Sequence, residues 1–346
     1  MMRLPLFGLC APRTLDEAAR VLEGERETAM VLAGGTDLLP NMKRRQQVPK
    51  TLISLRNIVG LQRLQFDENS ISLGPCVRLT TIEHDRRFRN GCSALWQAAS
   101  QVATPQIRYQ ATLGGNVCLD TRCLYYDQTY EWRKAINFCL KVGGDTCWVA
   151  PGSDRCMAVS STDTAPALIA LGARITLKSV DGERELSLVD LYDNDGKHYL
   201  VRQPNEILSQ IRLESIHGWK STYWKLRRRG SFDFPVLSIA AAAKIDDRGT
   251  VEDARIVLGA VSSRPIIAEQ AAQSLRGRKL EADAIEQAAS FSARLAKPLD
   301  NTDFNMSWRK RVTSTLVTYA LRELRGDDLR SERRFVTHQL SSENGN

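Results

Sequence analysis

Hydrophobic and polar positions along the first 60 residues follow first a helical and then a strand-like spacing. Thr14 and Glu17 form a capping box, in which each side chain satisfies an exposed amide at a helix start, and the helical pattern continues to about Leu22. Apolar runs at residues 29–33 and 51–55 predict two buried strands. We therefore expect a small βαβ subdomain over residues 1–60.

The pattern changes at about residue 61, where shorter elements begin. Strands are predicted at residues 71–74, 173–180, 238–245 and 254–261, and helices at 81–88, 94–102, 266–275, 281–296 and 308–325. This mixture is typical of the α+β class. We divide the chain into a domain of residues 1–217, with a second subdomain at 61–217, a C-terminal α+β domain of residues 218–326, and a charged tail of residues 327–346 without periodicity, predicted to be disordered.

The composition of the 346-residue chain is that of an ordinary soluble globular protein, with 42% hydrophobic and 25% charged residues. The apolar stretches are too short to cross a bilayer and the N-terminus lacks a secretion cleavage site, so we expect a cytoplasmic protein without membrane association. The net charge of +8 is partly concentrated at residues 227–229 and 330–334. These clusters indicate either a solvated face or a dock for an anionic partner, and no nucleic-acid-binding signature accompanies them.

Two glycine-rich segments are candidates for binding phosphate. Gly34-Gly35-Thr36 follows an apolar strand, and Gly114-Gly115-Asn116 follows Thr112-Leu113. Adjacent glycines let backbone amides approach a phosphate closely, and the hydroxyl or amide side chain adds a donor. One such segment indicates only a tight turn, whereas two favour a shared diphosphate. Neither matches the Gly-x-Gly-x-x-Gly dinucleotide fingerprint or the P-loop.

Four of the eight cysteines are clustered, because Cys123, Cys139, Cys147 and Cys156 lie within 34 residues. Disulfides are not expected in a cytosolic protein. Four thiolates bind either tetrahedral zinc or a [4Fe–4S] cluster, and these spacings match neither zinc ribbons nor ferredoxin motifs. Zinc, an iron–sulfur cluster and unligated thiols therefore all stay open at this point. The aromatic residues of the segment either shield a metal centre or form a local core.

Residues for acid–base or nucleophilic catalysis are not evident. The histidines, His84, His198, His217 and His338, are scattered without metal-ligand spacing, and no Ser-His-Asp arrangement is present. We predict no catalytic residue on this chain. Paired phosphate-binding segments and clustered thiols instead favour a protein that moves electrons between two redox groups.

The two glycine-rich segments carry a resemblance to a known family. Residues 33–38 and 112–116 resemble the pyrophosphate-binding loops of the flavoprotein subunits of the xanthine dehydrogenase and carbon monoxide dehydrogenase family, and residues 104–108 and Asp163 also look like that family. The resemblance covers about residues 1–325. It implies a PCMH-type FAD-binding fold followed by a C-terminal domain of the carbon monoxide dehydrogenase flavoprotein type. The FAD contacts that it implies are Ala33, Gly34, Gly35, Thr36, Asp37, Thr104, Thr112, Gly114, Gly115, Asn116, Asp163 and Lys225.

The cysteines lie in an insertion within this resemblance. Asn116 and Asp163 are 47 positions apart, whereas the resemblance implies a separation of about ten in most members, so a segment at about residues 118–160 is inserted. The insertion resembles that of the flavoprotein β subunits of 4-hydroxybenzoyl-CoA reductases, which carries an extra [4Fe–4S] cluster. The resemblance implies that Cys123, Cys139, Cys147 and Cys156 are the cluster ligands.

The implied function is electron entry into a larger enzyme. Electrons would pass from reduced ferredoxin through the [4Fe–4S] cluster and FAD to a partner subunit with [2Fe–2S] clusters and another with a molybdenum cofactor, as a dimer of heterotrimers. The reaction implied is the reductive dehydroxylation of 4-hydroxybenzoyl-CoA to benzoyl-CoA in anaerobic aromatic degradation. The alternatives are the flavoprotein subunit of another molybdenum hydroxylase, a zinc-stapled non-catalytic subunit and a stand-alone flavin oxidase.

Overall fold

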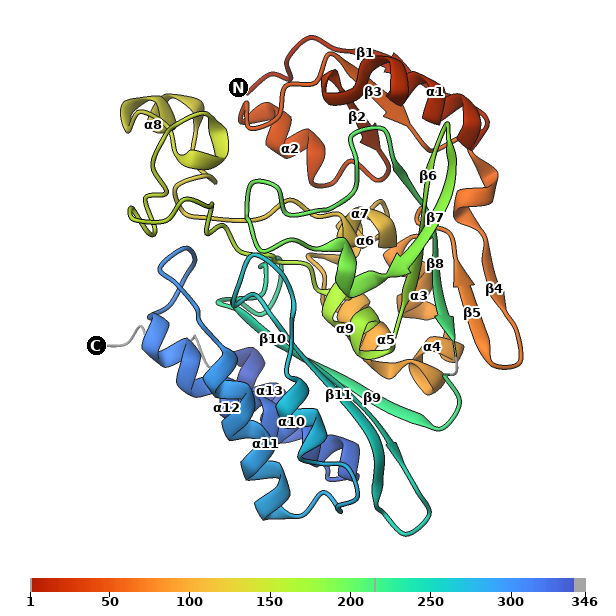
Figure 1. The fold of residues 1–346 in the computed structure, drawn as a ribbon, viewed down its shortest axis with the longest axis vertical. Helices are drawn as coiled ribbons and strands as arrows, with labels where there is room; N and C mark the ends of the chain where they lie inside the picture. The colour runs from red at the N-terminus through yellow and green to blue at the C-terminus, as the bar shows by residue number, and fades with distance from the viewer. Residues whose placement is uncertain (1, 215, 339–346) are drawn as a thin grey trace.

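The computed structural model describes residues 2–214 and 216–338 (Figure 1). Its first subdomain contains β1 (Gly8–Cys10), α1 (Leu15–Glu25), β2 (Ala29–Leu32), α2 (Leu38–Lys43) and β3 (Thr51–Ser54). The strands form a parallel sheet in the order β1-β3-β2. The predicted capping box is present, with Glu17 N donating to Thr14 Oγ1 at 3.2 Å, and Leu22 of α1 is buried in the core of this subdomain. The predicted βαβ arrangement is thus present.

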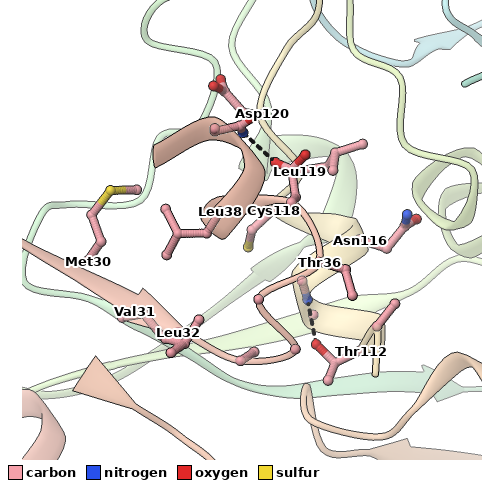
Figure 2. A pocket seen from close by; sticks show the side chains of 18 of the residues that line it. Met30, Val31, Leu32, Thr36, Leu38, Thr112, Asn116, Cys118, Leu119 and Asp120 are labelled. Atoms are coloured by element: carbon pink, nitrogen blue, oxygen red, sulfur yellow. Dashed lines mark hydrogen bonds between the residues drawn. The ribbon is translucent and has the colours of Figure 1, made fainter. Parts of the chain in front are cut away.

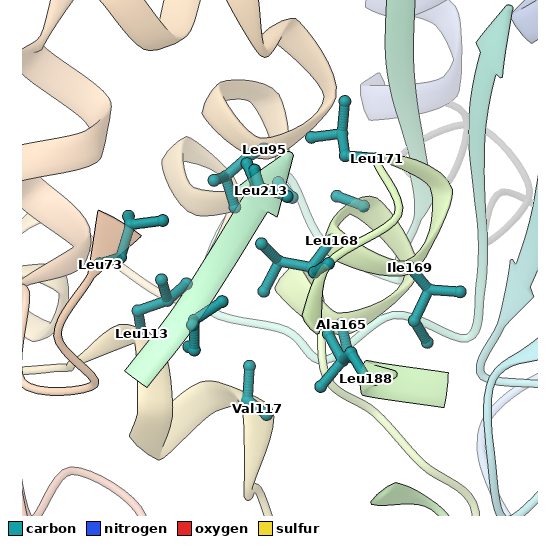
Figure 3. Close-up of a cluster of buried hydrophobic side chains, with 14 of the residues drawn as sticks. Leu73, Leu95, Leu113, Val117, Ala165, Leu168, Ile169, Leu171, Leu188 and Leu213 are labelled. Atoms are coloured by element: carbon teal, nitrogen blue, oxygen red, sulfur yellow. The ribbon is translucent and has the colours of Figure 1, made fainter. Parts of the chain in front are cut away.

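The second subdomain is built on a five-stranded antiparallel sheet. Its strands are β4 (Leu64–Phe66), β5 (Ser70–Leu73), β6 (Arg174–Ser179), β7 (Gly182–Ser187) and β8 (Ile207–Glu214), in the order β4-β5-β8-β6-β7. The accompanying helices are α3 (Leu79–His84), α4 (Arg86–Gly91), α5 (Ser93–Ser100), α6 (Pro105–Arg108), α7 (Leu113–Val117) and α9 (Thr164–Ala170). Figure 3 shows how Leu168 of α9, Leu95 of α5 and Leu213 of β8 meet in the core.

The C-terminal domain has an antiparallel sheet in the order β12-β11-β10-β9. Its elements are β9 (Trp219–Leu226), β10 (Leu237–Ile245), β11 (Val251–Gly259), β12 (Ile266–Ile267), α10 (Glu269–Gln273), α11 (Ala282–Leu295) and α12 (Met306–Arg325). Alternate residues of β10 face two different cores, because side chains alternate along a strand. Ile239 and Ala241 pack in the core of the C-terminal domain, and Ala240 and Ala242 pack in the core of the second subdomain. This sheet therefore joins the two domains.

The insertion at residues 118–160 lies between α7 and α9 and contains the short helix α8 (Tyr130–Ala135). Figure 1 shows α8 beside α2 of the first subdomain, and the Arg133 guanidinium donates to the Arg44 carbonyl at 2.5 Å. No helix within residues 2–214 and 216–338 is long and apolar enough to cross a membrane.

The structure corrects several sequence expectations. The helix predicted at residues 81–88 is divided at Asp85, whose extended backbone ends α3 and whose carboxylate caps Arg87 N of α4. The stretch 266–275 begins as strand β12 before α10.

The charged tail is also ordered over part of its length, as helix α13 (Arg330–His338). Arg333 pairs with Glu323 of α12 at 2.5 Å and stacks 4.1 Å from the Trp224 ring, and Val336 is buried. The segment lacks a helical hydrophobic pattern, and these tertiary contacts stabilise the helix instead. Residues 339–346 lie outside the described residues.

Arg309 gives a test of how the C-terminal domain is held together. Its guanidinium is fully buried and donates to the carbonyls of Val236 at 3.0 Å, Leu299 at 2.9 Å and Ala260 at 2.7 Å. We expect Arg309→Met to lower the free energy of unfolding by about 3 kcal/mol or more, because each unpaired buried carbonyl costs about 1–3 kcal/mol. Thermal denaturation of both variants checks this. Arg311→Met, an exposed position on the same helix, is the matched control, and equal melting temperatures for the two variants would contradict the account.

Candidate functional site

A cavity of about 420 Å³ lies between the first and second subdomains (Figure 2). Its walls come from β2 and the loop before α2, from α7, from the start of the insertion and from residues 199–208 and 232–234. The predicted contact residues that line it are Ala33, Gly34, Gly35, Thr36, Asp37, Thr112, Gly114, Gly115, Asn116 and Asp163. The two glycine-rich segments, about 80 positions apart in the sequence, therefore face one cavity.

The first glycine-rich segment is a turn between β2 and α2. Gly35 has a φ of +72°, a backbone conformation that glycine adopts without strain. A Cβ on Gly34 would lie only 2.2 Å from the Gln110 carbonyl oxygen, so the turn packs directly on the backbone that leads to α7. The amides of Gly34, Gly35 and Thr36 donate to no acceptor among the described residues. Free amides in a glycine turn form an anion-binding nest, which fits a diphosphate.

The second glycine-rich segment is the first turn of α7 rather than a loop. Thr112 caps the helix, accepting from Gly115 N at 3.1 Å, and Gly114 packs so tightly on Pro75 that a Cβ would lie 2.4 Å from it. The Asn116 Oδ1 accepts from Thr164 N at 2.9 Å and from the Thr162 and Thr164 hydroxyls at 2.9 and 2.7 Å. Asn116 thus connects the residues just before the insertion to those just after it.

Asp163 is buried in an ion pair. Its carboxylate lies 2.9 Å from Lys225 Nζ and accepts from the Tyr223 hydroxyl at 2.7 Å. Burial raises the pKa of Asp163, and the Lys225 ammonium opposes that rise. Lys225 also donates to the Gln101 carbonyl at 3.0 Å and lies behind Asp163, outside the cavity lining. Thr104 likewise lies outside it and caps α6 by accepting from Ile107 N.

The four clustered cysteines line a second, smaller cavity. Cys123, Cys139, Cys147 and Cys156 are all buried, and the other residues around them include Tyr125, Tyr126, Lys141 and Trp148. Burial raises the pKa of the Cys123 thiol to about 12, with Cys156 and Cys139 adding to the rise. Burial also raises the pKa of Cys156 to about 11, where Lys141 opposes the rise and Cys147 and Cys139 add to it. The four thiols are therefore close enough to influence one another.

A single metal ion has no ready-made site in this arrangement. Across residues 2–214 and 216–338, no group of three or more histidine, cysteine, aspartate or glutamate side chains is placed to hold one. The structure shows four free cysteines that line one small cavity.

The two cavities adjoin at the start of the insertion. Asp120 and Arg122 line the larger cavity, and Cys123, the next residue, lines the smaller one. Arg122 is buried, pairs with Asp37 and donates to Asn41 Oδ1 at 3.1 Å. Its Nε and the Oε1 of Gln47, also a lining residue, are buried without a protein partner, so polar atoms remain for a ligand.

Sequence reasoning did not single out Asp120, Arg122 or Lys141 as site residues. The first two had an available signal, because they immediately precede Cys123 in the segment Asp120-Thr-Arg-Cys123. Lys141 lies in an irregular stretch without a pattern to read.

An α+β fold with two glycine-lined walls around one cavity defines a nucleotide-cofactor-binding protein of the flavoprotein type. Residues 5–213 match the FAD binding domain in molybdopterin dehydrogenase, and residues 221–324 match the CO dehydrogenase flavoprotein C-terminal domain. The chain belongs to this family of FAD-binding subunits of molybdenum hydroxylases. The predicted fold class is confirmed.

Relatives and solved structures agree with this assignment. The aldehyde oxidoreductase FAD-binding subunit PaoB of Escherichia coli K12 is 30% identical over 308 residues, 84% of this chain and 91% of its own. The nicotinate dehydrogenase FAD-subunit of Eubacterium barkeri is 29% identical, over 81% and 83% of the two chains. The reconstituted CO dehydrogenase from Oligotropha carboxidovorans shares the fold with a TM-score of 0.78 at 22% identity, covering 94% of this chain and 100% of that one.

The close approach at Gly34 predicts the effect of one methyl group. Gly34→Ala would push the first turn away from the Gln110 carbonyl, so we expect FAD affinity to fall at least tenfold, or about 1.4 kcal/mol. The ratio of flavin absorbance to protein in the purified variant, followed by FAD titration, measures this. Gly24→Ala, in helix α1 with open space around it, should leave FAD binding unchanged. Normal FAD affinity in Gly34→Ala would exclude this turn from the binding site.

Proposed function

We propose that this chain is the FAD- and [4Fe–4S]-containing electron-transfer subunit of a 4-hydroxybenzoyl-CoA reductase. The observation that carries the proposal is the adjacency of two cavities in one chain. Four buried cysteines surround one cavity, and Arg122, next to Cys123, lines the cavity that fits the flavin nucleotide.

FAD, when bound, supplies the ability to accept and release electrons, and the protein positions it. The free amides of Gly34, Gly35 and Thr36 would hold the diphosphate. Asn116 and Asp163, each fixed by several hydrogen bonds, would shape the wall beside it, with Lys225 acting through Asp163.

The thiol cavity supports a cluster by its donor set and its burial. Four cysteine thiolates are the usual ligands of a [4Fe–4S] cluster. Tyr126 is almost fully buried beside the cavity, and the exposed Trp148 also lines it, so aromatic side chains form part of the wall around the thiols. The resemblance of the insertion to that of 4-hydroxybenzoyl-CoA reductases favours the cluster over zinc.

The proposed partners follow from the same assignment. The chain would assemble with a molybdenum cofactor subunit and a [2Fe–2S] subunit as a dimer of heterotrimers, and would receive electrons from reduced ferredoxin in the cytoplasm. Relatives are described as FAD-binding subunits or medium chains, which supports a role within a larger enzyme. The complex would remove the phenolic hydroxyl of 4-hydroxybenzoyl-CoA reductively, giving benzoyl-CoA in anaerobic aromatic degradation.

A second candidate is the flavoprotein subunit of a different molybdenum hydroxylase, with the cysteines holding a structural zinc. The names of the relatives favour it, because they include aldehyde oxidoreductase and nicotinate dehydrogenase subunits. The substrate in this case would also be bound by a partner subunit.

Metal and flavin analysis separates these candidates. In anaerobically purified protein we expect about four irons and four sulfides per FAD, the content of one [4Fe–4S] cluster. Cys139→Ser should lose the iron and sulfide and keep the FAD, because Cys139 lines only the smaller cavity. Cys10→Ser, a free cysteine outside the insertion, is the matched control and should keep both cofactors. One zinc per chain without sulfide would overturn the electron-entry proposal and leave the second candidate.

A further inference from the structure

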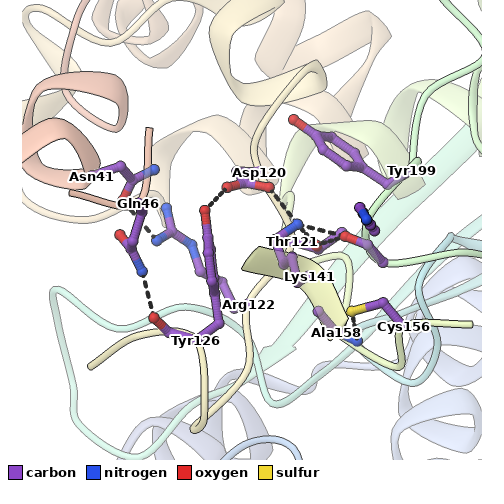
Figure 4. A network of polar contacts seen from close by, with 12 residues as sticks. Asn41, Gln46, Asp120, Thr121, Arg122, Tyr126, Lys141, Cys156, Ala158 and Tyr199 are labelled. Atoms are coloured by element: carbon purple, nitrogen blue, oxygen red, sulfur yellow. Dashed lines mark hydrogen bonds and ion pairs between the residues drawn. The ribbon is translucent and has the colours of Figure 1, made fainter. Parts of the chain in front are cut away.

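Asp120 and Lys141 form a buried ion pair in the wall between the two cavities (Figure 4). Lys141 Nζ lies 2.9 Å from Asp120 Oδ1, and only 6% and 5% of the two side chains are exposed. Asp120 lines the flavin cavity, whereas Lys141 lines the cysteine cavity. The pair therefore spans the wall with its negative end toward the larger cavity.

Lys141 is fixed in place by a complete set of contacts. Besides Asp120, its ammonium donates to Thr121 Oγ1 at 2.7 Å and to the Gly196 carbonyl at 2.5 Å. It also lies 4.9 Å from the ring centre of Tyr126 and 5.1 Å from that of Tyr199. Because three acceptors and two aromatic faces hold the ammonium, the charge stays at one point of the wall.

Asp120 is held equally firmly. Its second carboxylate oxygen accepts from the Tyr126 hydroxyl at 2.7 Å and from Gln47 Nε2 at 3.1 Å. Gln47 comes from the first subdomain, Tyr126 and Lys141 from the insertion. The carboxylate thus lies where the insertion contacts the flavin cavity. Its surroundings have a low dielectric constant, so its charge acts over a longer range than it would in water.

We propose that Asp120 and Lys141 are positioning residues through which the insertion sets the reduction potential of the flavin. A fixed carboxylate at the cavity wall makes adding electrons to the flavin less favourable, and the paired ammonium offsets part of that effect. The inference rests on the proposed function only in that the larger cavity binds FAD as an electron carrier. It does not depend on which group the cysteines bind.

Two substitutions with opposite expected effects test this inference. Asp120→Asn keeps the shape and removes the negative charge, so the flavin midpoint potential should become more positive. Lys141→Met leaves the carboxylate unpaired, so the potential should become more negative, and Lys141→Arg should restore a value close to that of the unmodified protein. The measurement is an anaerobic redox titration of the flavin absorbance in purified protein containing its FAD.

Asp145→Asn is the matched control, because Asp145 is an exposed acid of the same insertion that lines neither cavity. Shifts of the same sign in Asp120→Asn and Lys141→Met, or a shift in Asp120→Asn no larger than in Asp145→Asn, would overturn the inference. If the substitutions acted only by loosening the packing, both would shift the flavin midpoint potential in the same direction. Shifts of opposite sign therefore identify an electrostatic role. If Asp120→Asn fails to keep FAD, the flavin midpoint potentials of Lys141→Met and Lys141→Arg are compared instead. A more negative value in Lys141→Met alone supports the inference, and equal values overturn it. The purified protein could lack iron and sulfide and still show opposite shifts of the flavin midpoint potential in the two variants. That result would refute the cluster proposal and leave this inference standing.

Discussion

The flavin cavity depends on two close backbone contacts that only glycine permits. Gly34 lies against the Gln110 carbonyl and Gly114 lies against Pro75, and in both places a Cβ would overlap its neighbour. The first contact brings the turn after β2 next to the backbone that leads to helix α7, and so joins two subdomains that have separate sheets and separate cores, while the second fixes α7 within its own subdomain. Free amides on one side and the capped first turn of α7 on the other then face the same space. Without them the two walls of the cavity would be too far apart to contact one ligand together.

Contacts near both ends of the insertion attach it to the residues around the flavin cavity. Asn116 binds Thr162 and Thr164, which closes the base of the insertion, and Arg122 pairs with Asp37 in the first subdomain. Both anchors lie at the flavin cavity, so the cysteines that follow are placed beside it rather than at a remote surface. A buried guanidinium–carboxylate pair costs desolvation energy, and its additional hydrogen bond to Asn41 offsets part of that cost.

Local patterns predicted much of the fold, and long-range contacts explain where they failed. The capping box at Thr14 and the strand-like apolar run at residues 238–245 are local signals, and both have the expected structure. The segment Gly114-Gly115 was expected to be a loop and is helical, because Thr112 caps it. The cysteines were found from their density, but the Asp120–Lys141 pair was not, since 21 positions of irregular chain separate its members. Helix α13 was missed because its stability comes from Glu323 and Trp224, which belong to other elements.

The proposed function requires one chain to hold a flavin and an iron–sulfur cluster in adjoining cavities. Diffraction from anaerobically grown crystals, recorded on both sides of the iron and zinc absorption edges, tests it most directly. The account predicts iron anomalous density enclosed by Cys123, Cys139, Cys147 and Cys156, with FAD density between Gly34 and Gly114. A single zinc peak among the cysteines, or iron density located elsewhere, would contradict it.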